Sequence, residues 1–399
     1  MNIVIVGGGT AGWIAALFLL SEYKNSNITV IESDVIGILG AGEGSTPLMK
    51  KFLKKCNIDE NDFINKTKST FKLGIDFENW NVYNTSYKHP FINDSKAYHF
   101  DARLIAEYFK QISINRGITH INGIVKAFVQ NDKKDITNLV LSDDTTIPTD
   151  FVFDCSGLHR LLIGKLYNSN WVSYSNHLKV NTAVPFFLDR NDTNMELNTK
   201  AIAMDYGWMW MIPLQHRWGC GYVFDGNMID ENQAKIEVEI KLNRKIESPK
   251  TLKFSAGYYD NVWINNCISI GLASGFLEPL EAVSIHITLM ELNLIKKHLF
   301  KDNDTNIVNE KFSQIMNEHF LFIYYHYLCN KKNTQFWSDY NLDNAPKELH
   351  NFIKKDLNLS FSSNEEYVGK FKYNDIVQYA HYDWKLINNG IFGLNKSLI

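Results

Sequence analysis

The 399-residue sequence predicts an α/β fold that opens with a nucleotide-binding region, continues through a β-rich middle and ends in helices. Three observations support this prediction. A β-branched run followed by a glycine turn opens the chain, and two tryptophan-rich strands occupy its middle. The last hundred residues are polar, rich in Asn and Lys, and typical of helices. At this length the chain can bury a large core, and we expect two closely joined domains.

The opening 32 residues carry the most specific pattern in the chain. A strand, a turn, a helix and a second strand are expected in succession, at residues 1–6, 7–12, 13–20 and 28–31. The turn satisfies G-x-G-x-x-G through Gly7, Gly9 and Gly12, and the second strand ends at Glu32. Such glycines let the backbone approach a pyrophosphate at a helix N-terminus, and the acid can accept ribose hydroxyls. Because all parts occur in register, a dinucleotide site is favoured over a glycine turn that binds nothing.

Charge and composition exclude several classes of function. A net charge of −3 and a pI of about 6.5 give no indication of a nucleic-acid or anionic-membrane partner. The apolar N-terminus lacks the basic start of a signal peptide, and no apolar run approaches the roughly 18 residues of a membrane span. Five scattered cysteines without a C-x-x-C pair indicate free thiols in a cytoplasmic protein, and no metal site is expected.

The remaining elements follow in order along the chain. Helices are expected at 48–56, from 59, at 101–116 and after 281. Strands are expected at 70–80, 151–154, 208–214, 218–224 and 268–270, with a small antiparallel excursion before 150. The glycine-dense residues 37–47 form either a ligand-facing backbone or a surface loop. The long helix after 281 has an apolar stripe at Ile285, Leu289, Leu292, Ile295 and Leu299.

At three places in the chain, the residues taken alone indicate an ordinary structural role. Lys72 falls on the polar side of an alternating strand, where a solvated lysine is expected. Trp208 and Trp210 share one face of a hairpin, which usually belongs to a core. Glu281 lies just after a proline at the start of a helix, where an acid complements the helix dipole.

Together these segments resemble the flavin-dependent halogenases of the tryptophan-halogenase type. The similarity lies in GGGTAGW at the start, in GEGSTP at 42–47, in the W-x-W-x-I-P formed by Trp208, Trp210, Ile212 and Pro213, and in the contexts of Lys72 and Glu281. The similarity extends from residue 1 to about 337, and a weaker similarity is found at 381–393. The resemblance implies a glutathione-reductase-type, Rossmann-like FAD-binding domain, a β-rich substrate region and a helical C-terminal part.

The family chemistry implied is halogenation of an indole- or phenol-like molecule. Reduced FAD and O₂ give a flavin C4a-hydroperoxide, and halide converts it to hypohalous acid. An active-site lysine, Lys72, then delivers the halogen, while Glu281 stabilises the ring cation or removes its proton. The tryptophan motif would separate flavin from substrate. FAD contacts are implied for Gly7, Gly9, Thr10, Ala11, Gly12, Glu32, Ala41, Glu43, Arg103, Val125, Gly271 and Leu272.

A halide site is expected at the helix start formed by Ala282, Val283 and Ser284. Family members commonly carry hydroxyl residues at 282 and 283, so their absence predicts a preference for bromide or iodide over chloride. The chain is also shorter than the tryptophan-specific enzymes, which leaves the substrate open. The stretch 330–333 replaces a more typical Arg/Asp-bearing one.

The resemblance further implies a discontinuous FAD domain at 1–170 and 255–300, and a substrate region at 171–254 and 301–399. A separate flavin reductase would supply FADH₂, and a homo-oligomer is possible. Two alternatives remain at this point. A single-component aromatic monooxygenase would oxidise NADPH itself, and the tryptophan motif disfavours it. A non-catalytic flavin-binding protein is disfavoured by the presence of Lys72 and Glu281.

Overall fold

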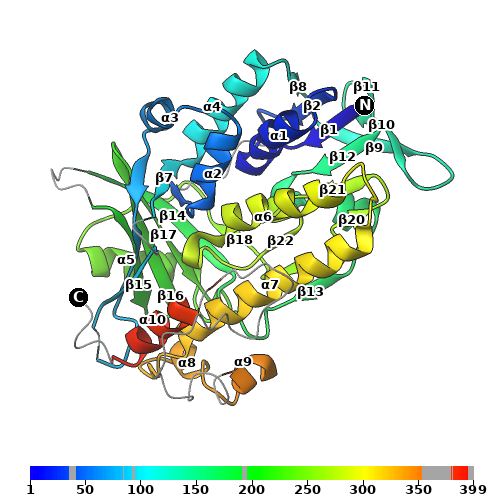
Figure 1. Ribbon diagram of the computed structural model, residues 1–399. Coiled ribbons are helices and arrows are strands. Elements are labelled where there is room, and N and C mark those ends of the chain that lie inside the picture. The colour runs from blue at the N-terminus through cyan, green and yellow to red at the C-terminus, as the bar shows by residue number, and fades with distance from the viewer. Residues whose placement is uncertain are drawn as a thin grey trace.

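A computed structural model describes residues 1–35, 42–83, 85–91, 95–190, 196–352, 379 and 381–393 of the protein. In this part of the chain, two large sheets and three small ones are joined by helices (Figure 1). The predicted α/β class is therefore confirmed, including the helical C-terminal part.

The six-stranded sheet contains the strands on either side of the predicted glycine turn. Its order is β20-β21-β12-β1-β2-β8, with bounds Trp263–Ile264, Cys267–Ser269, Phe151–Asp154, Asn2–Val6, Asn27–Glu32 and Thr119–Asn122. All neighbours pair in parallel except β20, which is antiparallel to β21. Helix α1 (Thr10–Glu22) follows β1 directly, as the opening motif predicts. Parallel strands end at a common edge, so the turns after β1, β12 and β21 come together there.

The seven-stranded sheet lies on the other side of the molecule. Its order is β18-β14-β17-β16-β15-β5-β6, with bounds Leu252–Lys253, Thr182–Asp189, Arg217–Phe224, Gly207–Pro213, Asn198–Met204, Gly74–Glu78 and Tyr87–Pro90. The predicted tryptophan hairpin is β16 and β17, which pair antiparallel. Trp208 and Trp210 belong to the main core, whereas Met209 belongs to a second core beneath α5 (Glu231–Leu242). Strand β16 is thus covered on both faces.

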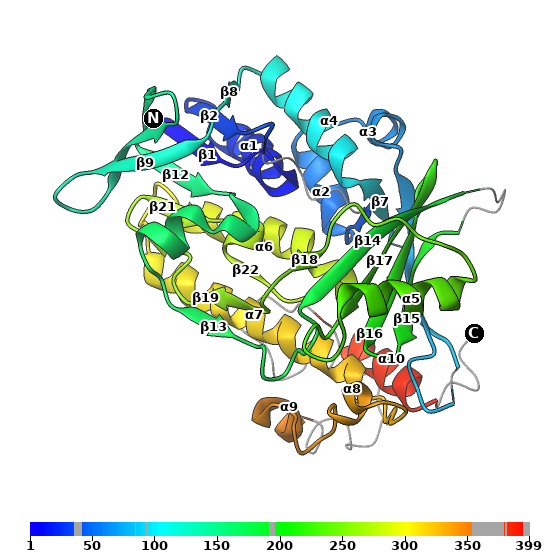
Figure 2. The same cartoon turned by 180° about the vertical axis from the view of Figure 1, so that it is seen from behind.

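Three smaller sheets complete the strand list. They are β3-β7-β4 (Gly42–Gly44, Ala97–Asp101, Thr70–Lys72), β11-β10-β9 (Thr146–Pro148, Ile136–Leu141, Val125–Gln130) and β13-β19-β22 (Trp171–Ser173, Gly257–Tyr259, Gly275–Phe276). The second is the predicted antiparallel excursion, and Figure 2 shows its β9 hairpin projecting from the body.

The remaining helices surround the sheets. They are α2 (Leu48–Lys55), α3 (Glu60–Thr67), α4 (Ala102–Asn115), α6 (Val283–His298), α7 (Thr305–Tyr327), α8 (Gln335–Ser338), α9 (Lys347–Phe352) and α10 (His381–Ile391). The predicted inner stripe of α6 is buried along its whole length. Helices α6 and α7 run side by side (Figure 1 and Figure 2). Of the helices in the described ranges, none combines the length and apolarity needed to cross a membrane.

The predicted single strand at 70–80 is wrong, and the error concerns Lys72. The strand is interrupted at Leu73, whose N–H donates to Leu197 O over 2.8 Å. Before this break β4 pairs with β7, and after it β5 pairs with β6 and β15. In one continuous strand, Lys72 would point to the opposite face from Ile75 and Phe77. Because the strand is interrupted between them, the side chains of all three are buried. The reading of Lys72 as a solvated lysine is therefore overturned.

The predicted domain boundaries stay a prediction. Strands β5 and β6 lie within the predicted FAD-domain range, yet they belong to the seven-stranded sheet. All five cysteines are buried free thiols.

Candidate active site

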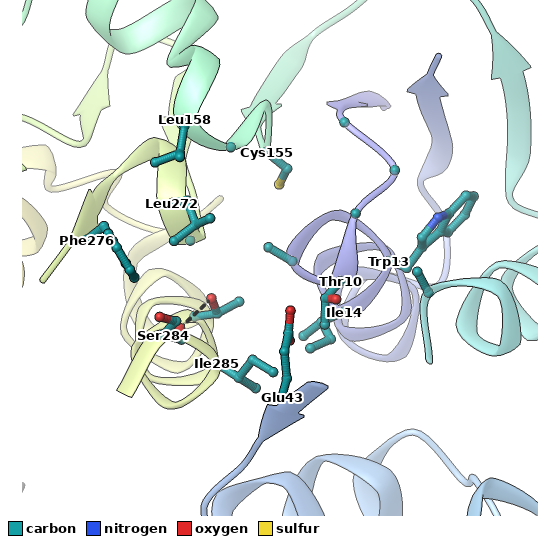
Figure 3. A pocket seen from close by; sticks show the side chains of 18 of the residues that line it. Thr10, Trp13, Ile14, Glu43, Cys155, Leu158, Leu272, Phe276, Ser284 and Ile285 are labelled. Carbon is teal, nitrogen blue, oxygen red and sulfur yellow. Dashed lines mark hydrogen bonds between the residues drawn. The ribbon is translucent and has the colours of Figure 1, made fainter. Parts of the chain in front are cut away.

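A single cavity of about 1460 Å³ lies between the two large sheets. One side of it is formed by the turns after β1, β12 and β21, which contribute Gly7, Ser156 and Gly271 among others. Its other side is formed by Trp208, Trp210 and Ile212 of β16, together with Lys72, Glu281 and Ala282. Figure 3 shows part of it, with Glu43 pointing into the space between Thr10 of α1 and Ser284 of α6. The cavity therefore brings the glycine turn and the two catalytic candidates into one space.

The glycine turn has the properties that a dinucleotide requires. Gly9 is the N-cap of α1, no side chain caps that end, and no acid lies in the first turn. A Cβ at Gly9 would meet no atom within 4 Å, so the turn has space for a ligand. A Cβ at Gly12 would instead lie 1.9 Å from the carbonyl oxygen of Gly7. Gly7, Gly9, Thr10 and Ala11 line the cavity, whereas Gly12 is needed for close packing of the turn.

Glu32 lies at the predicted place but is already engaged. Its carboxylate accepts a hydrogen bond from Lys110, and its Oε1 lies 2.8 Å from His120 Nε2. The sequence pattern gave no indication of these two partners, which come from α4 and β8. Glu32 still lines the cavity, and a Cβ at Gly8 would collide with its carboxylate. The acid is thus held in a fixed place beside the glycine turn.

The other predicted FAD contacts are distributed around the same cavity. Glu43 is half-buried, and burial, followed by the nearby charge of Asp101, raises the pKa of Glu43 to about 7. Arg103, Val125, Gly271 and Leu272 line the cavity as well. Ala41 lies outside the described residues.

Lys72 is fully buried at the inner end of β4. Its Nζ has no hydrogen-bond partner among the described residues and lies 5.5 Å from the centre of the Phe91 ring. A Cβ placed on Gly44 would lie only 3.2 Å from Nζ, so the ammonium abuts the backbone of β3. Desolvation lowers the pKa of Lys72 to about 8, against the opposing effect of the Glu281 charge. An amine in this state is available for chemistry near neutral pH.

Glu281 precedes α6 and does not occupy its first turn, so the prediction that it complements the dipole of this long helix is wrong. It lies in a 3₁₀ turn at Leu280–Ala282, before α6, with φ of 62°. Ala282 follows with φ of 55°, so two consecutive non-glycine residues are left-handed. Such backbone is unfavourable by roughly 1–2 kcal/mol per residue, and it persists where the surroundings impose it. The turn directs the Glu281 side chain into the buried site.

Two histidines hold the Glu281 carboxylate. His89 Nδ1 lies 2.9 Å and 3.0 Å from its two oxygens, and His326 Nε2 lies 3.0 Å from Oε1. Burial alone would raise the pKa of Glu281, but the charge of His89 and the bonds from both histidines hold it well below its usual value. Burial acts to lower the pKa of His89, yet Glu281 and Asp383 raise it to about 10. Sequence reasoning missed these partners, because isolated histidines 192 and 45 residues from Glu281 carry no local signal.

The tryptophan motif forms one wall of the cavity. The rings of Trp208 and Trp210 meet edge to face, with centroids 6.2 Å apart. Trp210 lies against Gly221 of β17, where an added Cβ would be 2.1 Å from the ring. Ile212 lines the cavity too, whereas Pro213 does not and uses its carbonyl to accept a hydrogen bond from Thr70.

The predicted halide segment is only partly directed at the cavity. Ala282 and Ser284 line it, together with Ile285, but Val283 is buried and does not. The N–H of Ala282 donates to Pro279 O over 3.1 Å. The first turn of α6 leaves its own N–H groups without intrahelical acceptors. The halide site at this helix start stays a prediction.

The Rossmann-type sheet, its glycine turn and a buried lysine in one cavity define a nucleotide-binding enzyme. The chain belongs to the tryptophan halogenase family, whose model matches residues 2–96 and 93–391. This is a family of flavin-dependent enzymes, and the resemblance inferred from the sequence motifs is confirmed.

Named relatives agree with this assignment. The chain is 27% identical to 7-chloro-L-tryptophan 6-halogenase of Kutzneria sp. (strain 744), covering 84% of this chain and 81% of that protein. It is 27% identical to tryptophan 7-halogenase of Lentzea aerocolonigenes, covering 84% and 78%. A solved flavin-dependent halogenase from Xanthomonas campestris superposes with a TM-score of 0.88 at 28% identity, covering 98% of this chain and 88% of that one.

Proposed function

We propose that this protein halogenates a small indole- or phenol-like molecule, using FADH₂ delivered by a separate reductase, O₂ and a halide ion. The observation that carries the proposal is the meeting of Lys72 and Glu281 with the glycine turn in one cavity. Both residues are buried, both have perturbed pKa values, and the tryptophan wall lies beside them.

The described residues fit FAD. The open space at Gly9 and the uncapped start of α1 would receive the pyrophosphate, and Glu32 would lie by the ribose. Glu43, Arg103, Gly271 and Leu272 would line the rest of the cofactor. When bound in reduced form, FAD together with O₂ supplies the oxidising power that converts halide to hypohalous acid.

Lys72 would receive the halogen. A buried amine whose pKa is lowered by desolvation has a substantial neutral fraction, and a neutral amine is the form that bonds to an electrophilic halogen. An ammonium would instead hold hypohalous acid by hydrogen bonds. Both roles require Nζ to be free of competing partners, and it has none among the described residues.

Glu281 would act on the aromatic ring. Attack by the ring on the halogen gives a cation at the ring carbon, which a nearby carboxylate stabilises in a dry site. The contacts from His89 and His326 keep the carboxylate anionic and oriented. The halide would lie at the start of α6, near Ala282 and Ser284, with bromide or iodide preferred over chloride.

The test is a reconstituted reaction containing the protein, a flavin reductase, FAD, NADH and O₂, with mixed halides and an indole and phenol panel. Mass spectrometry should detect a halogenated product with wild type, and almost none with Lys72→Ala or Glu281→Gln. Lys96→Ala is a matched control, because Lys96 lies over Phe71 and is not in the cavity lining. Oxygenated product formed from NADPH without a reductase would identify a monooxygenase instead, and would overturn the proposal.

A further inference from the structure

The contacts around Glu281 fix the positions of several protons. An ionised carboxylate can only accept hydrogen bonds, so each of its contacts with an imidazole nitrogen contains one proton shared between the two groups. This holds for Nδ1 of His89, at 2.9 Å from Oε1, and for Nε2 of His326, at 3.0 Å from the same oxygen. Both oxygens of Glu281 thus face an imidazole donor, since Oε2 also lies 3.0 Å from His89 Nδ1 and shares its one N–H with Oε1.

The second nitrogen of each histidine meets a different group. Nδ1 of His326 lies 2.8 Å from the carbonyl oxygen of Phe322. This oxygen accepts a hydrogen bond but carries no charge. Nε2 of His89 lies 3.3 Å from Oδ1 of Asp383, a second carboxylate. His89 thus bridges two carboxylates, each of which favours a proton on the nitrogen that faces it.

Asp383 comes from α10, far from the other members in sequence. The helix is held by contacts that do not involve this residue. Trp384 lies 4.9 Å from the Phe322 ring centre, Tyr325 donates to Asn388 over 2.6 Å, and Asn81 donates to Gly390 O over 3.0 Å. Removing the charge of Asp383 is therefore expected to leave α10 docked.

We infer that Asp383 and His89 are positioning residues, forming a chain Asp383–His89–Glu281 that keeps both nitrogens of His89 protonated and so holds Glu281 as an oriented anion. The inference deepens the proposed function of Glu281 and rests on it. In this chain Glu281 acts on the ring cation as a fixed, oriented negative charge.

The charged surroundings agree with the inference. Among the described residues, the titratable groups that interact electrostatically with the pair include Lys72 from β4, His326 and His319 from α7, Asp383 from α10, and the hydroxyls of Tyr87 and Tyr379. Burial opposes charge on His89, but the two carboxylates outweigh it and its pKa rises to about 10. The proton on His89 is then retained throughout the neutral range. It is lost only as the pH rises toward that value.

The first test uses the protein with FAD and no substrate. Histidine side chains labelled with ¹⁵N report by NMR the pH at which each imidazole loses a proton, and His89→Gln assigns the His89 signal. In Asp383→Asn the His89 midpoint should fall by roughly one pH unit or more, the size of one close charge contact. Asp383→Glu should restore part of the shift. The separate pair of a half-buried His298 and an exposed Asp302, 3.1 Å apart, serves as a control whose signals should not move.

The second test measures halogenation of indole with bromide across pH. The alkaline limb of the rate should move to lower pH in Asp383→Asn, while Asp302→Asn keeps the wild-type profile. An unmoved His89 midpoint would overturn the chain, whatever the activity. If wild type does not halogenate indole or the wider panel, the proposed function fails, and the midpoint alone still decides whether the chain exists. A shifted midpoint with an unchanged rate profile would overturn the positioning role.

Discussion

Trp208 donates its indole N–H to Glu278 Oε1 over 3.0 Å, which ties the cavity wall to a fully buried acid. The Tyr327 hydroxyl donates to the same oxygen over 2.7 Å, while Oε2 has no partner among the described residues. Burial raises the pKa of Glu278 to about 7, although both donors act in the opposite direction. The orientation of the wall is therefore linked to an acid that titrates near neutrality.

Replacing Glu278 with Gln should change how stability depends on pH. The folded pKa of about 7 exceeds the unfolded value of 4.5, so folding retains a proton between these values. The stabilising effect of this proton is complete below pH 4.5 and is lost as the pH rises through 7. Glu278→Gln has no such proton to lose, so at pH 8 it should avoid a loss in the free energy of unfolding of about 1–3 kcal/mol that the wild type shows. Melting curves of both proteins at pH 5 and pH 8 measure the difference, and an equal Tm gap at both pH values would contradict it.

Lys72→Met should abolish halogenation and stabilise the protein. Met has a similar length and no charge, so the cost of burying an unpaired ammonium disappears. Because the folded pKa of about 8 lies below the unfolded 10.5, the penalty is complete below pH 8 and fades as the pH rises to 10.5. The gain in Tm over wild type should therefore shrink between those values. Reoxidation of FADH₂ by O₂ should continue, and a lower Tm at pH 7 would contradict this account of Lys72.

Two glycines of the turn should respond differently to substitution. Gly9→Val places its side chain in open space, so the protein should fold but lose FAD affinity by tenfold or more. Gly12→Ala places a Cβ against the Gly7 carbonyl, so it should lower the Tm even without FAD. Fluorescence titration with FAD and melting curves separate the two effects. Unchanged FAD affinity in folded Gly9→Val would mean that the turn does not face the cofactor.

The halide preference should be governed by position 282 and not by 283. A hydroxyl at Ala282 would face the cavity and replace part of the chloride hydration, at about 1.5–3 kcal/mol per charge-assisted bond. Ala282→Ser should therefore move a bromide-to-chloride competition at least tenfold toward chloride. Val283→Thr is the matched control, because the Val283 side chain does not line the cavity. Predominant chlorination by wild type would contradict the preference, and an iodide reaction without enzyme corrects for free peroxide chemistry.

Sequence patterns were sufficient where the signal is local. The glycine turn, the tryptophan hairpin and the stripe of α6 depend on residues a few positions apart, so periodicity and turn chemistry predict them. They were insufficient where the chain switches between sheets. Alternation assigned Lys72 to the solvent side, because nothing local marks the break at Leu73. The resemblance to halogenases compensated for this at Lys72 and Glu281, but it did not reveal His89, His326 or Asp383.

Strand β16 has implications for enzyme engineering. Its cavity face carries Trp208, Trp210 and Ile212, and its opposite face carries Met209 in the core beneath α5. Libraries that vary only the cavity face would create cavities or steric clashes, because the opposite face of the strand is already closely packed against the core beneath α5. Broadening the range of aromatic molecules accepted should therefore require paired changes, one facing the cavity and one facing α5. The two residues of such a pair are adjacent in the sequence, as Trp208 and Met209 are, so a short randomised cassette covers them.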